Sequence, residues 1–267
     1  MAKAIKQIEE KKSLADLFIV VLDARAPLST YNEEFDKIAP TKPRLFVLTK
    51  LDMADETKID ALKAKFNHGI DKVIAVNLKK SSSKSKIIKE AEKLLEDKRQ
   101  RDLAKGLLKP RLRAIVVGVP NSGKSTLINK VSGKSSAKVG NMPGVTRGQQ
   151  WVNSGKIQLL DTPGILWPKM ESDLIGVKLA IIGSIKASVI PKDEFFNEGY
   201  KLLSKYYPEK ITELGLEPSQ DLDIIYENKN KLALKKNFII KAGKPDLGKA
   251  HNFFINYLRD LKGVTYD

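Results

Sequence analysis

Apolar and polar positions along the chain follow two patterns. Four short apolar runs are almost uninterrupted, which is typical of strands buried on both faces of a parallel sheet. They occupy 45–48, 73–77, 113–118 and 157–160. Apolar residues at helical spacing appear at 87–95 and at 125–131, between these runs. The alternation predicts an α/β domain with a mostly parallel sheet and helices on both faces.

The pattern changes near residue 190. From there to the C-terminus, helical spacing continues without strand-like runs. The segments 198–207 and 252–261 carry stripes of aromatic residues and leucine, which we interpret as core. We therefore predict a first domain over 1–189 and a C-terminal α-helical domain over 190–267.

The segment 118–125, GVPNSGKS, lies between a predicted strand and a predicted helix and matches a phosphate-binding loop. Its glycines allow backbone N–H groups to face phosphate oxygens at a helix N-terminus. Lys124 is placed to reach the β and γ phosphates, and the Ser125 hydroxyl to bind Mg²⁺. A Gly/Ser-rich turn that matches by chance is the alternative, which the flanking strand and helix disfavour.

Two segments after this loop suggest nucleotide hydrolysis. The sequence DTPG at 161–164 follows an apolar run, so Asp161 can hold Mg²⁺ through water and the Gly164 N–H can meet a γ-phosphate. Between the loop and DTPG lies PGVT at 143–146, where Thr146 could close over Mg²⁺ in the triphosphate state. Either tetrapeptide alone is weak evidence, and their positions after the loop strengthen both.

The sequence TKLD at 49–52 follows another predicted strand and is typical of a guanine-reading loop. The Asp52 carboxylate can accept from guanine N1–H and the exocyclic amine, whereas adenine offers an acceptor at N1. The Lys50 stem can lie on the base. Thr49 stands where asparagine is commoner, and we expect its shorter hydroxyl to reach less far toward the base and the phosphate loop, which would weaken guanine affinity somewhat. For Lys50 and Asp52, a solvated loop pair is the alternative. The segment NLK at 77–79 lies where a further base-contacting loop would be, but it is only a loose match, so we assign it no contact with the base.

The guanine-reading motif precedes the phosphate loop, which is the reverse of the usual order in GTPases. This order, and several segments, resemble the ribosome biogenesis GTPase A (RbgA/YlqF) family of circularly permuted GTPases. The segments are DARAP at 23–27, GVPNSGKS at 118–125, NMPGVTRGQQW at 141–151, DTPGILWP at 161–168, LAIIGSIK at 179–186 and KPDL at 244–247. The resemblance spans nearly the whole chain and implies a permuted P-loop GTPase domain followed by a helical domain that touches RNA.

The resemblance also implies a GTPase that assembles the bacterial large ribosomal subunit, binding immature particles and rRNA in its GTP state. GTP or GDP, Mg²⁺ and K⁺ are the implied ligands. With the motifs, it places nucleotide contacts at Thr49, Lys50, Asp52, Asn121, Ser122, Gly123, Lys124, Ser125, Thr126 and Gly164. Mg²⁺ is assigned to Ser125, Thr146 and Asp161, K⁺ to Asn121, and catalysis to Lys124, Thr146 and Gly164. A purely structural role for Asn121, shaping the turn, stays open.

The residue after DTPG departs from many GTPases. Ile165 stands where a glutamine commonly orients the attacking water, and an alkyl chain cannot hydrogen-bond water. Relatives use a histidine in a Phe-Pro-Gly-His segment ahead of Met-Ala-Lys-Ala, and this sequence begins at that MAKA. His68 and His251 match no such position, and we interpret them as surface or packing residues. A GTP-sensing RNA-binding scaffold with negligible hydrolysis therefore stays open, as does an ATPase or kinase, which Asp52 disfavours.

The net charge of +16 is concentrated in the middle of the chain. Residues 79–189 carry +14 of it, including the basic connector at 79–113. Within this connector, Ile87, Ile88, Ala91, Leu94 and Leu95 form one apolar stripe, so the other face presents cations. A polyanion is the natural partner, and the lack of interleaved aromatic residues favours the backbone of folded RNA. A merely solvated basic helix is the alternative.

The chain has no cysteine, which suits a reducing compartment, and its apolar runs are far too short to span a membrane. We therefore expect a cytoplasmic protein, monomeric, with neither membrane nor DNA as partner. For Asp23 and Arg25 of the DARAP segment, the default interpretation is an ion pair that fixes a strand end.

Overall fold

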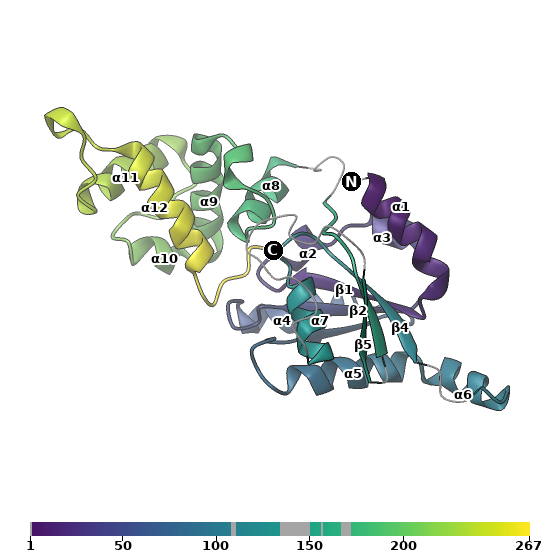
Figure 1. The fold of residues 1–267 in the computed structure, drawn as a ribbon. Helices are drawn as coiled ribbons and strands as arrows, with labels where there is room; N and C mark the ends of the chain where they lie inside the picture. The colour runs from purple at the N-terminus through teal and green to yellow at the C-terminus, as the bar shows by residue number, and fades with distance from the viewer. Residues whose placement is uncertain (1, 108–110, 134–149, 156, 167–171) are drawn as a thin grey trace. The chain divides into compact units, whose positions relative to one another are not determined.

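The computed structural model describes residues 2–107, 111–133, 150–155, 157–166 and 172–267 (Figure 1). The chain divides into two compact units. The first comprises Met1–Lys169 together with Asp267, and the second comprises Met170–Tyr266.

A six-stranded sheet organises the first unit. Its strands are β1 (Leu17–Asp23), β2 (Arg44–Thr49), β3 (Lys72–Ala75), β4 (Leu112–Val117), β5 (Gln150–Ser154) and β6 (Ile157–Asp161). They lie in the order β3-β2-β1-β4-β6-β5, and the neighbours pair in parallel except for the β5–β6 hairpin. This arrangement confirms the mostly parallel sheet predicted from the four apolar runs.

The strand order reverses between β1 and β4. From β1, the chain adds β2 and β3 on one side, and then crosses to add β4, β6 and β5 on the other. The last residues of neighbouring strands stay in register, with Asp23 opposite Thr49 and Val116 opposite Asp161. Parallel strands therefore bring the loops that follow β1, β2, β4 and β6 to one edge, where ligands of such sheets bind.

Helices cover both faces of the sheet. One face packs against α1 (Ala2–Lys11), α3 (Glu34–Ile38) and α4 (Ile59–Ala64), and the other against α5 (Ser83–Leu94) and α7 (Lys124–Ser132). Alternate residues of β1 face opposite layers, because side chains of a strand point to opposite faces in turn. The layered α/β architecture expected from the sequence is confirmed.

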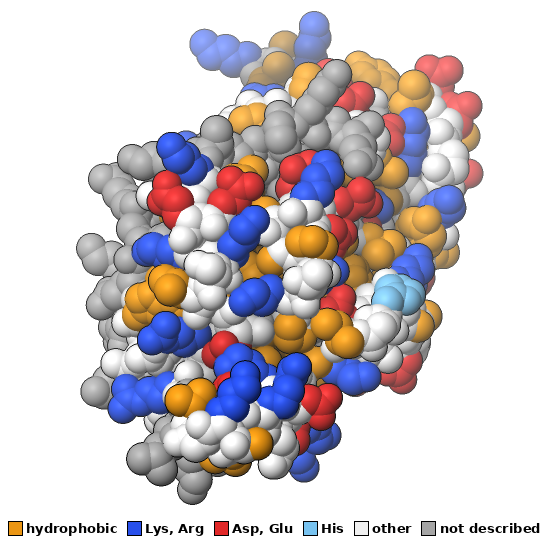
Figure 2. All heavy atoms as spheres, turned by 90° about the vertical axis from the view of Figure 1, so that its right-hand side faces the viewer, with side chains coloured by type: hydrophobic (Ala, Val, Ile, Leu, Met, Phe, Trp, Pro, Cys, Tyr) orange, Lys and Arg blue, Asp and Glu red, His pale blue; other side chains and the backbone are white. Residues whose placement is uncertain are grey.

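The basic connector consists mainly of α5 and α6 (Glu96–Ala104). Ile87, Ala91 and Leu95 are buried in the core, and Ile88 and Leu94 pack against it. The apolar stripe predicted for this segment is therefore confirmed, and lysines such as Lys89 are exposed. In Figure 2, Lys and Arg side chains cover the lower part of the molecular surface. Figure 1 places α5 and α6 at the same height.

The second unit is helical. Its main helices are α8 (Asp173–Ile181), α9 (Lys192–Tyr206), α10 (Pro208–Thr212), α11 (Leu222–Lys235) and α12 (Leu247–Asp260). The ring of Phe254 packs against those of Phe196 and Tyr200, with centroid distances of 4.6 and 5.8 Å, and these three side chains are fully buried. The two stripes interpreted as core from the sequence are confirmed as core.

Helix α8 lies in this second unit, although the sequence analysis places its residues in the first domain. It packs against α9 and α12, and the Arg259 guanidinium of α12 donates to the Ala180 carbonyl at 3.3 Å. Its mostly apolar sequence does not indicate which unit it joins. None of the helices in the described part of the chain combines the length and apolarity needed to cross a membrane.

Candidate nucleotide-binding site

The phosphate loop connects β4 to α7 and lies tightly against β1. Gly118 has a φ of +149°, and a Cβ there would lie 2.4 Å from the Val21 carbonyl oxygen. Gly123, with a φ of +102°, directly precedes the first residue of α7. Both positions therefore require glycine. This tight turn presents backbone N–H groups at a helix N-terminus, which is the geometry that binds phosphate.

Lys124 is buried inside this loop. Its ammonium donates to the Val119 carbonyl at 2.7 Å. Burial disfavours the charged form and lowers the pKa of Lys124 to about 8, although the Asp161 carboxylate acts in the opposite direction. A phosphate would offer this desolvated cation a charged acceptor in place of a neutral carbonyl, which is a stronger hydrogen bond.

Asp161, at the end of β6, faces the first turn of α7. The Ser125 hydroxyl donates to Asp161 Oδ2 at 3.5 Å. The other oxygen, Oδ1, is buried without a hydrogen-bond partner among the described residues. Burial raises the pKa of Asp161, while Lys124 opposes that shift. A buried carboxylate oxygen without a hydrogen-bond donor, next to a hydroxyl, is a suitable pair of ligands for Mg²⁺. This ion prefers oxygen ligands and is usually bound by protein carboxylates and substrate phosphates together.

The segment after Asp161 rests on the phosphate loop. A Cβ at Gly164 would meet the Pro120 backbone nitrogen at 2.6 Å, and the Ile165 N–H donates to the Gly118 carbonyl at 3.1 Å. Gly164 is therefore held beside the loop. The Ile165 side chain is buried in the sheet's core, so it is directed into the protein interior.

The predicted guanine-reading loop adjoins the phosphate loop through Thr49. Its hydroxyl oxygen lies 2.6 Å from the Ser122 carbonyl and 3.0 Å from the Leu22 carbonyl, and its one proton can serve one of them at a time. The side chain expected to reach less far than asparagine still contacts the phosphate loop. The end of β2 lies so close to the loop that a short side chain reaches it.

Two ion pairs involve the other residues of this loop. Lys50 has a φ of +55°, and its ammonium lies 2.8 Å from Asp23 Oδ2. Asp52 Oδ2 lies 2.8 Å from the ammonium of Lys79. The sequence analysis assigns Lys79 no contact. Because β2 and β3 are parallel neighbours, the loops after them meet, and that adjacency was the available signal.

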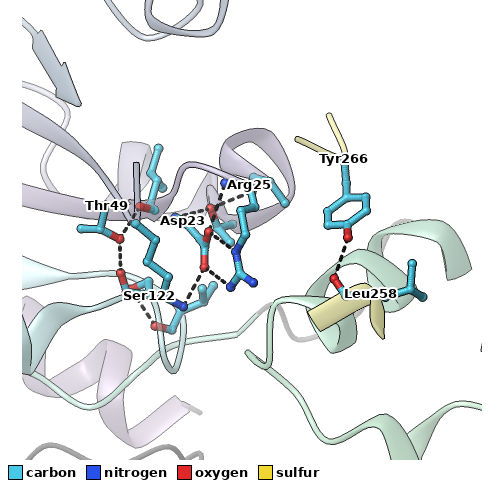
Figure 3. A network of polar contacts seen from close by, with 11 residues as sticks. Asp23, Arg25, Thr49, Ser122, Leu258 and Tyr266 are labelled. Atoms are coloured by element: carbon cyan, nitrogen blue, oxygen red, sulfur yellow. Dashed lines mark hydrogen bonds and ion pairs between the residues drawn. The ribbon is translucent and has the colours of Figure 1, made fainter. Parts of the chain in front are cut away.

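Asp23 and Arg25 form the strand-end ion pair that the sequence suggested (Figure 3). Arg25 donates through Nε to Asp23 Oδ1 at 3.0 Å and through a terminal nitrogen to Oδ2 at 2.8 Å. Burial alone raises the pKa of Asp23, but the neighbouring Lys50 and Arg25 cations outweigh it and lower the pKa to about 2. The carboxylate is therefore ionised at neutral pH.

The remaining predicted site residues are distributed as follows. Asn121 occupies the phosphate loop with a φ of +59°, and the Ser122 hydroxyl donates to the Val119 carbonyl at 3.0 Å. Thr126 lies in the first turn of α7. Thr146 lies outside the described residues, as does the rest of 134–149.

The two histidines behave as surface and packing residues, as predicted. His68 is exposed. His251 is buried in the helical unit with its ring 6.1 Å from that of Phe195.

Comparison with known proteins agrees with this geometry. The family model described as 50S ribosome-binding GTPase matches residues 113–210. The ribosome biogenesis GTPase A of Priestia megaterium is 40% identical over 268 residues, which cover 100% of this chain and 93% of that protein. That of Bacillus licheniformis is 37% identical over 98% of this chain and 93% of its own length. The chain belongs to the ribosome biogenesis GTPase A family.

A solved structure extends this comparison to the fold. GNP-bound YlqF from T. maritima is 26% identical, covers 99% of this chain and 97% of its own, and aligns with a TM-score of 0.66. Membership of the ribosome biogenesis GTPase A family confirms the resemblance drawn from the motifs and makes the chain a GTP-binding protein. It excludes the ATPase or kinase alternative. The permuted order follows from the fold, since β1, β2 and β3 precede the phosphate-loop strand.

Proposed function

We propose that this protein hydrolyses GTP as an assembly factor of the large ribosomal subunit, and that it binds the immature particle and its rRNA in the GTP state. One observation carries the nucleotide part. The Thr49 hydroxyl on the Ser122 carbonyl brings the guanine-reading loop and the phosphate loop together, so one nucleotide can span both. The names of the relatives support the ribosomal part.

In this proposal, each loop holds one end of GTP. Asp52 accepts the two guanine donors and the Lys50 stem covers the base, while the backbone of 118–125 and Lys124 hold the phosphates. Ser125, Asp161 and Thr146 hold Mg²⁺. The metal, when bound, neutralises charge that develops on the phosphate oxygens.

Hydrolysis by the protein alone is expected to be slow. The Ile165 side chain is buried in the core and has no hydrogen-bonding atom, so it cannot orient the attacking water. We propose that the ribosomal particle completes the site. We also propose that Asn121, in the left-handed backbone conformation within the loop, supports a K⁺ ion that stabilises the charge of the transition state.

The nucleotide state is proposed to control affinity for the particle. Gly164 lies against Pro120 of the phosphate loop, so a γ-phosphate there contacts the segment that follows DTPG directly. The proposal extends to 140–146, which lie outside the described residues, as a second segment that responds to the γ-phosphate. Because the triphosphate contacts both segments and the diphosphate does not, the two nucleotides favour different conformations.

Two surfaces are proposed to contact rRNA in a monomeric, cytoplasmic protein. The first is the cationic face of the connector, whose apolar side is committed to the core. The second is a set of lysines in the helical unit. These are Lys235, Lys236, Lys241, Lys244 and Lys249, all of them exposed. In the connector, cations without interleaved aromatic rings suit the backbone of folded RNA.

GTP turnover with purified large-subunit precursors tests the proposal. Slow turnover alone, acceleration by the precursor and a higher rate in K⁺ than in Na⁺ are the expected results, with tighter particle binding in a GTP analogue than in GDP. Equal particle affinity in both nucleotides contradicts the state-dependent binding.

The second candidate is a GTP-sensing RNA scaffold, which the buried Ile165 favours. It would bind GTP and show no turnover even with the precursor. Particle-stimulated hydrolysis, abolished by Lys124→Met, would exclude it.

A further inference from the structure

The carboxylate of Asp23 gathers several donors at the end of β1. The side chain is 1% exposed, and it accepts from the Arg25 backbone N–H and from two nitrogens of the Arg25 guanidinium. The Lys50 ammonium approaches Oδ2 at 2.8 Å. Figure 3 shows this network beside Thr49 and Ser122. An aspartate of the DARAP segment is therefore joined directly to the first charged residue of the guanine-reading loop.

Arg25 orients this carboxylate without help from Lys50. Its guanidinium contacts both oxygens of Asp23, its own backbone N–H adds a third bond, and the side chain is only 5% exposed. A forked, buried contact of this kind allows little rotation of the carboxylate. The position of Asp23 Oδ2 is thus determined by β1 and Arg25, and Lys50 conforms to it.

Lys50 needs such an anchor. Its backbone is in the left-handed region, which is unfavourable for a residue with a Cβ, and its side chain is 28% exposed. The Ala24 N–H donates to the Thr49 carbonyl at 2.9 Å, so the chain after β1 also holds the residue before Lys50. The end of β1 therefore constrains the start of the guanine-reading loop through both backbone and side chain.

The same strand end supports the phosphate loop. The Val21 carbonyl lies where a Cβ of Gly118 would be, and the Leu22 carbonyl shares the Thr49 hydroxyl with Ser122. Because the Asp23 carboxylate contacts Lys50 directly, a displacement of that carboxylate would move the Lys50 side chain before it affected the phosphate loop.

We propose that Asp23, oriented by Arg25, is a positioning residue for guanine-nucleotide binding: it holds the Lys50 ammonium so that the lysine stem lies where the base binds. The inference rests on the proposed roles of Lys50 and Asp52. It assigns a function to the DARAP segment, which neither the fold nor the phosphate chemistry explains.

The test is nucleotide binding by Asp23→Asn, Lys50→Met and the double variant, measured with fluorescent GDP. An asparagine side chain keeps the shape and removes the charge, so we expect the GDP Kd to rise about tenfold. Lys50→Met is expected to weaken binding in the wild-type background and to add less than about twofold in the Asp23→Asn background. The rate of GTP hydrolysis at saturating GTP is expected to stay unchanged, because the Asp23 carboxylate contacts Arg25 and Lys50 and not Lys124, Ser125 or Asp161.

Asp71→Asn is the matched control. Asp71 is also buried and holds an arginine, with Arg44 Nε at 3.2 Å and the Arg44 N–H at 2.9 Å, but it lies at the other end of β2. It is expected to lower thermal stability without changing the GDP Kd. If Asp23→Asn does not fold, the milder variant Arg25→Lys replaces it. This variant keeps the positive charge but loses the two-nitrogen contact with Asp23, and it is expected to raise the GDP Kd.

Unchanged GDP affinity in Asp23→Asn, or additive effects of Asp23→Asn and Lys50→Met, would overturn the inference. An effect of Asp71→Asn on affinity equal to that of Asp23→Asn would do the same, since both would then act through stability. Failure of this inference can be distinguished from failure of the proposed function. If Lys50 and Asp52 do not bind guanine, the single variants Lys50→Met and Asp52→Asn leave guanine binding unchanged.

Discussion

Single polar atoms in this site can contribute strongly to ligand binding, because they are buried where water cannot compete with a ligand. Asp161 Oδ1 has no donor among the described residues, and the Lys124 ammonium donates to a neutral loop carbonyl. In the proposed site, Asp161 would gain the metal as a partner and Lys124 would gain the phosphate, and each would form a stronger, charge-assisted contact. Asp52 is different, because it is partly exposed and already paired with Lys79.

Replacing Asp52 with asparagine is expected to move nucleotide preference from guanine toward xanthine. The amide offers a donor where the carboxylate only accepts, so it suits a base with a carbonyl at position 2. Competition of GTP and xanthosine triphosphate for a fluorescent nucleotide measures this.

Lys79→Gln is the control for that experiment, since it breaks the same ion pair but leaves the carboxylate. The Lys79 side chain is 82% exposed, so the pair contributes little and preference for guanine should persist. An Asp52→Asn variant with wild-type preference would remove Asp52 from the base site.

Gly164→Ala is expected to weaken binding of GTP more than of GDP. The new Cβ would lie 2.6 Å from the Pro120 backbone nitrogen and 2.8 Å from its Cα, so the segment must move away from the loop where a γ-phosphate binds. The steric cost is on the order of 1–3 kcal/mol. Separate titrations with GDP and a GTP analogue test it.

Gly248→Ala, in the first turn of α12, is the comparison variant. A Cβ there meets only Asp246 Oδ1, at 3.4 Å, and alanine favours a helix, so both nucleotide affinities should stay at wild-type values. Equal weakening of GDP and GTP by Gly164→Ala would argue against a role specific to the γ-phosphate.

At the level of elements, α5 carries lysines of two kinds: one bonded to the sheet and others available to a partner. The Lys86 ammonium donates to the Ala75 carbonyl at 3.0 Å and thereby ties the helix to β3. Lys86 and Lys89, one turn apart, are both exposed, so the hydrogen bond to β3 and not burial distinguishes Lys86. The same residue type thus serves two purposes on one helix, which composition alone does not reveal.

Replacing Lys89 and Lys105 with glutamine is expected to weaken binding to ribosomal precursors and to flatten its salt dependence. Each phosphate that the double variant no longer neutralises lowers the magnitude of the slope of log K against log salt by about 0.7–0.9. Binding measured across a salt series checks this.

Lys86→Gln provides the contrast, since it should lower stability and leave the salt slope unchanged. An unaltered slope in the Lys89/Lys105 double variant would support the solvated-helix alternative for the connector.

At the level of the whole molecule, the two units carry different acid-sensitive groups. In the helical unit, burial lowers the pKa of His251 to about 4, with Lys229 and Lys192 acting in the same direction and Asp193 opposing them. In the first unit, the Asp23 pKa is lowered to about 2. Each shift defines a pH window in which the unfolded chain binds a proton that the folded chain does not.

The helical unit is therefore expected to lose stability first on acidification. His251 contributes stability above its ordinary pKa of 6.5, and this is lost as the pH falls toward about 4. Asp23 contributes above 3.8 and loses its contribution toward about 2. Hydrogen exchange, corrected at each pH for the unfolded rate, should show protection of 172–266 falling before that of the sheet.

His251→Gln should flatten the response of the helical unit between pH 6.5 and 4 without altering that of the sheet. Simultaneous loss of protection in both units of the wild-type protein would contradict separate windows.

The local motifs were predictable because they depend on residues close together in the chain. The glycines of 118–125 were expected to allow a tight turn, and Gly118 and Gly123 adopt the required positive φ. The unit that α8 joins was not predictable, because an apolar helix suits either core. The contact of Thr49 with the phosphate loop was not predictable for a related reason, since it depends on how closely β2 approaches a loop far along the chain.

The sequence by itself indicated four of the six strands, β2, β3, β4 and β6, together with the chemistry of the phosphate loop and the permuted order of the motifs. Each follows from periodicity or from side-chain chemistry within a short stretch. Only the tertiary structure decided which charged groups meet. The pairs Asp23 with Lys50 and Asp52 with Lys79 join different strand ends, and they exist because parallel strands in register bring those ends to one edge of the sheet.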